Sequence, residues 1–161
     1  MNSTIKRCIA LIGPLALVCG VGAADAPGVD QWTSTQLKEF EQSLAPRLSA
    51  QKVASQTIAR YGNHSMLIAH REGNGQGEYH LTQADLIVVQ TGEATILIGG
   101  DLVDGRSTSA TEMIGTSVRG GTEKTLRPGD MLHIPAKTPH QMIIAPGKQI
   151  TYVTVKVDVP Q

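Results

Sequence analysis

Four side chains that can bind a metal ion stand in two stretches of the sequence. Glu78 and His80 are two positions apart, so on a β-strand both side chains leave the same face. Asp85 begins the next run of strand-forming residues, and His140 follows a turn that contains two prolines. Two imidazoles and two carboxylates that meet on one concave face can bind a divalent ion in octahedral or near-octahedral geometry, with free positions for substrate or water.

The ligands on offer are nitrogen and oxygen atoms alone. Both cysteines, Cys8 and Cys19, lie in an N-terminal segment that we expect to be cleaved, so the mature chain has neither a thiolate ligand nor a disulfide. Mixed nitrogen and oxygen ligands suit iron, manganese, nickel or zinc, and the residue types do not choose among these metals. The predicted cofactor is therefore a divalent transition metal of unassigned identity.

His133 is the candidate for a catalytic group that moves protons. An imidazole suits this role because its ordinary pKa lies near neutrality. His133 shares a strand face with Met131 and directly precedes Ile134 and Pro135. It either lines the pocket as a proton shuttle or substrate contact, or is simply hydrogen-bonded in the interior.

The first residues predict the compartment. Lys6 and Arg7 precede an uncharged apolar run over residues 8–21, and small residues follow at 21–24. This order is typical of a secretory signal peptide over residues 1–24 and predicts a periplasmic or secreted protein. The run is short for a membrane span, so we expect no membrane attachment after cleavage, with an uncleaved anchor as the alternative.

The charge balance argues against one class of partner. The chain has 14 basic and 14 acidic residues, and the predicted signal peptide carries two of the basic and none of the acidic ones. The mature chain is therefore slightly acidic and cannot neutralise a row of phosphates, so we expect no nucleic-acid partner. The expected partner is a small-molecule ligand, held by one domain with an ordinary hydrophobic core.

Residues 25–62 are predicted to form a linker and a helical segment. Thr33 and Gln36 have the spacing of a capping box. The apolar residues that follow at helical spacing are Leu37, Phe40, Leu44 and Leu48. Pro46 should kink or divide this helix. A second, weaker helical pattern covers residues 50–60.

Residues 63–161 are predicted to form a β-barrel. Short runs rich in Val, Ile, Thr and Tyr alternate with turns that contain glycine. The predicted strands cover residues 64–71, 78–81, 85–90, 94–98, 131–134, 141–144 and 150–157. Residues 99–125 form a long connection rich in Gly, Ser and Thr, with one or two short strands. Many short strands with regular turns in a small domain predict a mainly β fold, either a barrel or a sandwich.

Two motifs carry a resemblance to the cupin family. The family's first motif is G-x5-H-x-H-x(3–4)-E-x6-G, and its second is G-x5-P-x-G-x2-H-x3-N. His80, Asp85 and Gly92 keep the internal spacing of the first motif, with Asp in place of Glu. Pro135 and His140 keep the spacing of the second, counted from a glycine at position 129. The resemblance implies a single-domain jelly-roll barrel (a double-stranded β-helix) with an N-terminal helix, and it implies a metal-binding role for His80, Asp85 and His140.

The sequence also departs from the family motifs. Glu78 stands at the family's first histidine, which keeps a possible ligand and adds negative charge to the site. Lys137 stands at the turn glycine and predicts a turn without the positive φ that glycine favours. Ile144 replaces the final asparagine. A barrel that has lost its metal therefore stays open as an alternative, although two inward-facing carboxylates without compensation would be costly.

The resemblance implies a range of functions. The leading hypothesis is an exported metal-dependent enzyme, an oxygenase, isomerase or lyase, that acts on a small oxygenated molecule. The alternative from a different class is a non-catalytic module that binds or senses a small ligand. A third is a structural role in a homodimer, because cupin barrels commonly pair through edge strands. If the face of the last strand that carries Tyr152 enters the barrel, Lys156 adds a positive contact for an acidic substrate.

Overall fold

The computed structural model describes residues 28–160, and residues 32–161 belong to one structural unit. The predicted signal peptide lies outside the described residues. Within the described part of the chain, no helix combines the length and the apolar character that a membrane span requires. The fold class is mainly β with one N-terminal α-helix, as the sequence predicts.

Helix α1 (Ser34–Leu44) begins at the predicted capping box. Gln36 N donates to Thr33 Oγ1 at 3.3 Å, and Thr33 N donates to Gln36 Oε1 at 2.8 Å. The helix ends before Pro46, which lies in a single 3₁₀ turn, η1 (Ala45–Arg47). The predicted cap and the predicted division at Pro46 are both confirmed.

The predicted second helix over residues 50–60 is wrong. Strand β1 (Val53–Arg60) occupies this stretch and pairs antiparallel with β2 (His64–Arg71). Three of its eight residues, Val53, Thr57 and Ile58, are β-branched, and this type loses rotamer freedom in a helix but packs well on a pleated sheet. Pairing with β2 therefore outweighs a weak helical pattern, and the sheet begins ahead of residue 63.

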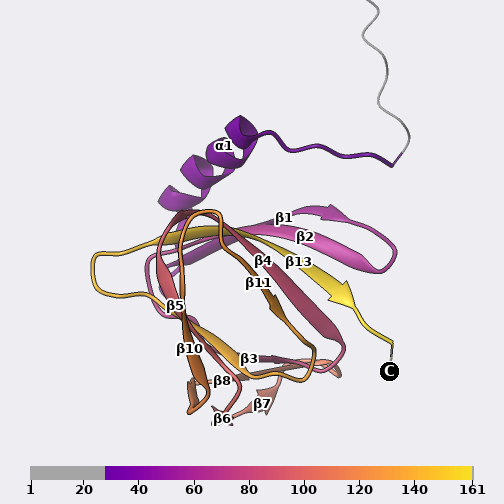
Figure 1. The fold of residues 1–161 in the computed structure, drawn as a ribbon, viewed down its shortest axis with the longest axis vertical. Coiled ribbons are helices and arrows are strands. Elements are labelled where there is room, and N and C mark those ends of the chain that lie inside the picture. The colour runs from indigo at the N-terminus through magenta and orange to yellow at the C-terminus, as the bar shows by residue number, and fades with distance from the viewer. Residues whose placement is uncertain (1–27, 161) are drawn as a thin grey trace, which may run out of the picture. The chain divides into compact units, whose positions relative to one another are not determined.

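Two antiparallel sheets face each other (Figure 1). The five-stranded sheet has the order β1-β2-β13-β4-β11, with β13 (Ile150–Asp158), β4 (Gln83–Gly92) and β11 (Met131–Ile134). The six-stranded sheet has the order β10-β5-β12-β3-β8-β7. Its strands are β10 (Thr122–Leu126), β5 (Ala94–Ile98), β12 (His140–Ile143), β3 (Gly77–His80), β8 (Glu112–Gly115) and β7 (Arg106–Ser107).

The connection over residues 99–125 holds more strands than predicted. It contains β7, β8 and most of β10, together with a separate two-stranded ribbon of β6 (Asp101–Val103) and β9 (Ser117–Arg119). Glycines at 99, 100, 120 and 121 have positive φ, so they allow tight turns between these short strands. Elsewhere the predictions for β2, β5 and β11 match the observed strands residue for residue.

The strand period of two divides the apolar residues between two clusters. Side chains that point into the barrel form the main core, and they include Ala69 and Tyr152. Their strand neighbours Ile68 and Val153 point the other way and pack with Leu44 of α1. Helix α1 therefore covers the outer face of the five-stranded sheet and leaves the interior to the barrel strands (Figure 1).

The turn before β12, at Lys137, has a backbone conformation that differs from the one predicted from the sequence. Lys137 has φ 62°, in the left-handed region, so the prediction of a turn without positive φ is wrong. Lys137 N donates to the carbonyl oxygen of His80 at 2.7 Å, which ties the turn to the end of β3. This hydrogen bond holds a conformation that strains any residue with a Cβ atom.

We expect Lys137→Gly to stabilise the protein. Glycine has no Cβ to clash in the left-handed region, so the free energy of unfolding should rise by about 1 kcal/mol in urea titrations. Lys137→Ala is the matched control, because it removes the same side chain but keeps the Cβ atom, and it should give no gain. Equal effects of the two substitutions would show that the turn stores no backbone strain.

Candidate metal centre

Three pairs of directly opposed residues build the site at one end of the barrel interior. Each pair joins two neighbouring strands. The pairs are His140 with Glu78 (β12 and β3), His80 with Glu112 (β3 and β8), and Lys156 with Asp85 (β13 and β4). Residues directly opposite each other on antiparallel strands have adjacent side chains, so the register of the two sheets brings these six groups together.

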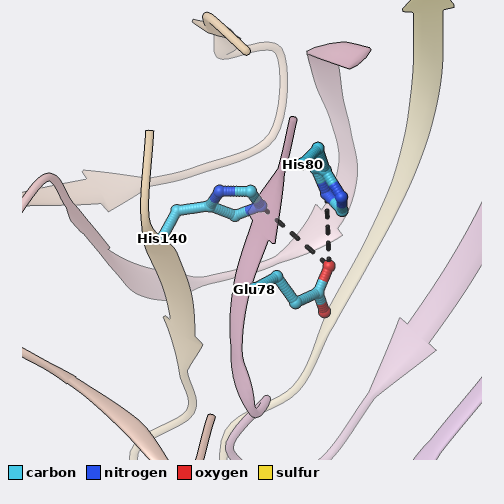
Figure 2. A group of neighbouring side chains, drawn as sticks. All are labelled: Glu78, His80 and His140. Atoms are coloured by element: carbon cyan, nitrogen blue, oxygen red, sulfur yellow. Dashed lines mark ion pairs between the residues drawn. The ribbon is translucent and has the colours of Figure 1, made fainter. Parts of the chain in front are cut away.

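Glu78, His80 and His140 form a group that can hold a metal ion (Figure 2). Each offers one ligand atom, and the three atoms lie within 4.8 Å of one another. Glu78 Oε2 lies 3.7 Å from His80 Nε2 and 4.0 Å from His140 Nε2. Both histidines are buried, so their rings are held in place by packing. One oxygen and two nitrogens thus converge from two strands.

The tautomers of both histidines suit metal binding. His80 Nδ1 lies 2.5 Å from Glu112 Oε2, and His140 Nδ1 lies 3.0 Å from the carbonyl oxygen of Thr138. A carboxylate and a carbonyl only accept hydrogen bonds, so Nδ1 carries a proton in both rings. In the neutral rings the lone pairs are therefore on Nε2, and both Nε2 atoms face Glu78.

Asp85 lies close to the other three predicted ligands and also forms an ion pair with Lys156. Its Oδ2 lies 3.4 Å from His80 Nε2 and 3.7 Å from His140 Nε2. Lys156 Nζ donates to both Asp85 oxygens, at 3.0 Å and 3.2 Å. The structure therefore brings all four predicted ligands together, and it places a lysine ammonium beside one of them.

Lys156 also touches a histidine. Its Nζ lies 2.9 Å from His80 Nε2. One hydrogen fits between these two nitrogens, so one of them donates it and the other accepts it. Tyr152, Thr154 and Lys156 all line the cavity, so the Tyr152 face of β13 is the one that enters the barrel.

The charges around His80 favour its protonated form in the absence of a metal. Burial disfavours the imidazolium and the Lys156 charge opposes it, but hydrogen bonds to Asp85 and Glu112 outweigh both and raise its pKa to about 9. For Asp85, burial alone would raise the pKa, but hydrogen bonds and charges from His80 and Lys156 lower it. Asp85 therefore stays ionised at neutral pH.

A cavity of about 200 Å³ adjoins the metal-binding group. Its wall combines polar and charged side chains with apolar ones, among them Leu67, Ile87, Ile96 and Met142. Arg71 also lines it; its Nε donates to Tyr152 Oη at 2.8 Å, and its guanidinium lies 3.5 Å from Glu78 Oε1. The Arg71 guanidinium, the Tyr152 phenol and the metal-binding group thus face one small cavity.

Sequence reasoning missed Arg71 and Glu112. Arg71 shares the inward face of β2 with Leu67 and Ala69. The period-two alternation of that strand could therefore have predicted that Arg71 points into the barrel. Glu112 lies in the long connection over residues 99–125, whose strands are too short for such a pattern. Only the pairing of β8 with β3 places Glu112 beside His80.

The proton-shuttle role predicted for His133 is corrected by the structure. His133 is exposed on β11 and does not line the cavity, while its neighbour Ile134 is buried in the core. Alternate residues of a strand point to opposite faces, so the strand that buries Ile134 turns the His133 imidazole to solvent.

Comparisons with known proteins identify the fold of this chain but do not assign the chain to a family. No protein-family model matches the sequence, and no curated protein matches it. Among solved structures, the TT1209 protein of Thermus thermophilus is 16% identical with a TM-score of 0.52, covering 74% of this chain and 94% of that one. A recombinant oxalate oxidase in complex with glycolate is 16% identical with a TM-score of 0.50, over 68% of this chain and about half (53%) of the oxidase.

A third solved structure is the cupin-like protein tm1010 from Thermotoga maritima. It is 14% identical with a TM-score of 0.49 and covers 65% of this chain and 68% of that one. At these identities the likenesses concern the fold alone.

We expect stability to depend on the protonation of His80. The folded pKa of about 9 lies above the ordinary value near 6.5, so this stabilisation is fully present below pH 6.5 and is lost as the pH rises through 9. With a chelator present, the free energy of unfolding should fall by up to about 3 kcal/mol over this range. Urea titrations from about pH 6 to about pH 10 measure the slope.

Glu112→Gln should flatten that slope, because a neutral amide stabilises the imidazolium less than a carboxylate does. Glu123→Gln is the control, since Glu123 is an exposed acid on β10. A slope that Glu112→Gln leaves unchanged would contradict the assigned role of Glu112.

Proposed function

We propose that this chain is an exported metal-dependent enzyme of the cupin type that acts on a small oxygenated molecule, because its two motifs resemble those of that family and its barrel is similar to solved structures such as an oxalate oxidase. Glu78, His80, Asp85 and His140 would hold a divalent transition metal. The observation that carries the proposal is that both histidines direct Nε2 at Glu78 while Nδ1 is tied to an acceptor. Partners of this kind orient metal-binding histidines in many proteins.

The residues present fit such an ion. Two imidazole nitrogens and two carboxylates form the mixed donor set that suits iron, manganese, nickel or zinc. Glu112 is placed to hold the His80 ring, and the carbonyl of Thr138 is placed to hold the His140 ring. Three of the proposed ligands, Glu78, Asp85 and His140, line the cavity, so an ion held there would be open to it.

The cavity suits a small, acidic substrate. Its volume of about 200 Å³ is below the roughly 300–1,000 Å³ of pockets for drug-sized ligands. Arg71 and Lys156 offer positive charge to a carboxylate or another oxyanion, and apolar residues such as Leu67 and Ile87 can pack against the rest of a small substrate. A bound divalent ion would polarise a substrate carbonyl, carboxylate or hydroxyl, which supports oxygenation, isomerisation or elimination.

One observation favours a second candidate function. Lys156 already provides a cation to His80 and Asp85, so the same cavity can stay assembled without a metal. The protein would then bind or sense a small anionic ligand without catalysis. This candidate needs Arg71 and Lys156 but not the lone pairs of the histidines.

We expect the mature protein to bind about one divalent ion per chain and His80→Ala or His140→Ala to lose most of it. Elemental analysis of protein purified without a metal-affinity tag, after reconstitution with iron, manganese, nickel or zinc, measures the occupancy. His133→Ala is the matched control, because this histidine is exposed and does not line the cavity. Occupancy below about a tenth of an ion per chain in the wild type would sink the enzyme proposal.

Ligand binding separates the two candidates. The small molecule that co-purifies with the protein is identified by mass spectrometry and then titrated against the wild type and the His80→Ala/His140→Ala double variant. A metal-dependent enzyme should lose affinity for it in the double variant, because the metal contributes to binding. Unchanged affinity would favour the metal-free binding module.

Export has its own test. The protein recovered from outside the cytoplasm should have a mass that lacks residues 1–24. A full-length mass in the cytoplasmic fraction would contradict export but would not bear on the proposed metal centre.

A further inference from the structure

We infer that Lys156 is a built-in competitor of the metal ion, and that its ammonium must leave His80 before His80 can bind the metal. The inference rests on the proposed function, since it concerns the same ligand set. Lys156 Nζ lies 2.9 Å from His80 Nε2 and 3.0 Å from Asp85 Oδ1. It therefore contacts two of the four proposed ligands at hydrogen-bonding distance.

The lysine ammonium and a metal ion compete for one position beside His80 and Asp85. His80 Nδ1 is committed to Glu112, so Nε2 is the only ring atom that faces the centre. A metal ion would bind at that nitrogen, and Lys156 Nζ already lies 2.9 Å from it, so the ammonium and the ion cannot both occupy this position. A divalent ion at His80 would also lie within a few ångströms of the ammonium, where like charges repel strongly in a partly buried site.

The negative charge of the surrounding carboxylates explains why the Lys156 ammonium lies at this position. Three carboxylates surround the centre, those of Glu78, Asp85 and Glu112, and two of them have cationic partners in Arg71 and Lys156. The side chain of Asp85 is only 5% exposed, and an uncompensated carboxylate at that depth is costly. In the metal-free protein Lys156 therefore compensates the charge of Asp85, as a divalent ion would in the metal-bound protein.

Lys156 has room to move aside. Its side chain is 20% exposed and lines the cavity, whereas that of Asp85 is almost fully buried. The four-carbon stem of a lysine is flexible, so the ammonium can turn into the cavity while β13 keeps its register. Metal loading then requires a side-chain movement and no change in the barrel.

Two consequences follow for the measured behaviour of the chain. The metal affinity of the wild type is lower than its four ligands alone would give, because binding must displace Lys156. The metal-free protein stays stable, because Asp85 keeps a counter-ion. Replacing Lys156 with an uncharged residue should therefore strengthen metal binding and weaken the metal-free fold at the same time.

The test compares the wild type with Lys156→Met, which keeps the length of the side chain and removes its charge. Zinc and manganese(II) salts are titrated into the chelator-treated mature protein by calorimetry, and thermal unfolding is followed with and without each ion. We expect Lys156→Met to bind the ion about tenfold to a hundredfold more tightly than the wild type. Its melting temperature should be lower than the wild-type value without metal and should rise further on metal addition.

Controls make the outcome specific to this lysine. Lys148→Met removes another lysine that is paired with a carboxylate, that of Glu93 at 2.9 Å, and it should leave the metal affinity unchanged. If Lys156→Met does not fold, Lys156→Gln keeps a polar group and removes the charge, and the same gain in affinity is expected.

The possible results separate the two proposals. Equal or weaker metal affinity in the Lys156 variants, with metal bound by the wild type, overturns the competition and leaves the metal centre intact. An absence of metal binding in the wild type and in every variant overturns the metal centre itself, and the competition with it.

Discussion

The buried carboxylate of Asp85 sets the constraint on which the rest of the site depends. Its side chain is 5% exposed and lies inside a largely apolar barrel, where an ionised group without a partner is costly. Partners reach it from two other strands: Lys156 from β13 and His80 from β3. Burial alone would raise the pKa of Asp85, but the contacts with His80 and Lys156 lower it. The pKa of His80 is raised by Asp85 and Glu112, which outweigh burial and the Lys156 charge.

The register of both sheets makes these contacts possible. Three opposed pairs lie on three different strand ladders, and a slip of one residue in any ladder would turn its side chains to the other face. The main core fixes that register, because inward residues such as Ala69 and Tyr152 alternate with outward residues that pack under α1. Packing of apolar residues on two faces of one sheet thus determines where the charged groups meet.

The local patterns of the sequence predicted much of this arrangement. The spacing of Glu78 and His80 placed both on one face, and the motif spacing brought in Asp85 and His140. Failures occurred where tertiary pairing decides the outcome. β1 was predicted as a helix, although its partner β2 was predicted correctly, because a local hydrophobic pattern does not register the pairing of two strands. Glu112 reaches His80 only through the pairing of β8 with β3. His133 was assigned to the pocket because the pattern of a four-residue strand does not say which face is buried.

The hydrogen bond from Lys137 N to the carbonyl oxygen of His80 couples two parts of the chain that lie far apart in the sequence. It fastens the turn that leads into His140 to the backbone of the other histidine, so the two imidazoles are carried on one rigid frame. Opening of this turn would move His140 away from Glu78 and His80, which share strand β3. His140 could then leave the group through a local backbone fluctuation, without a change of its own rotamer.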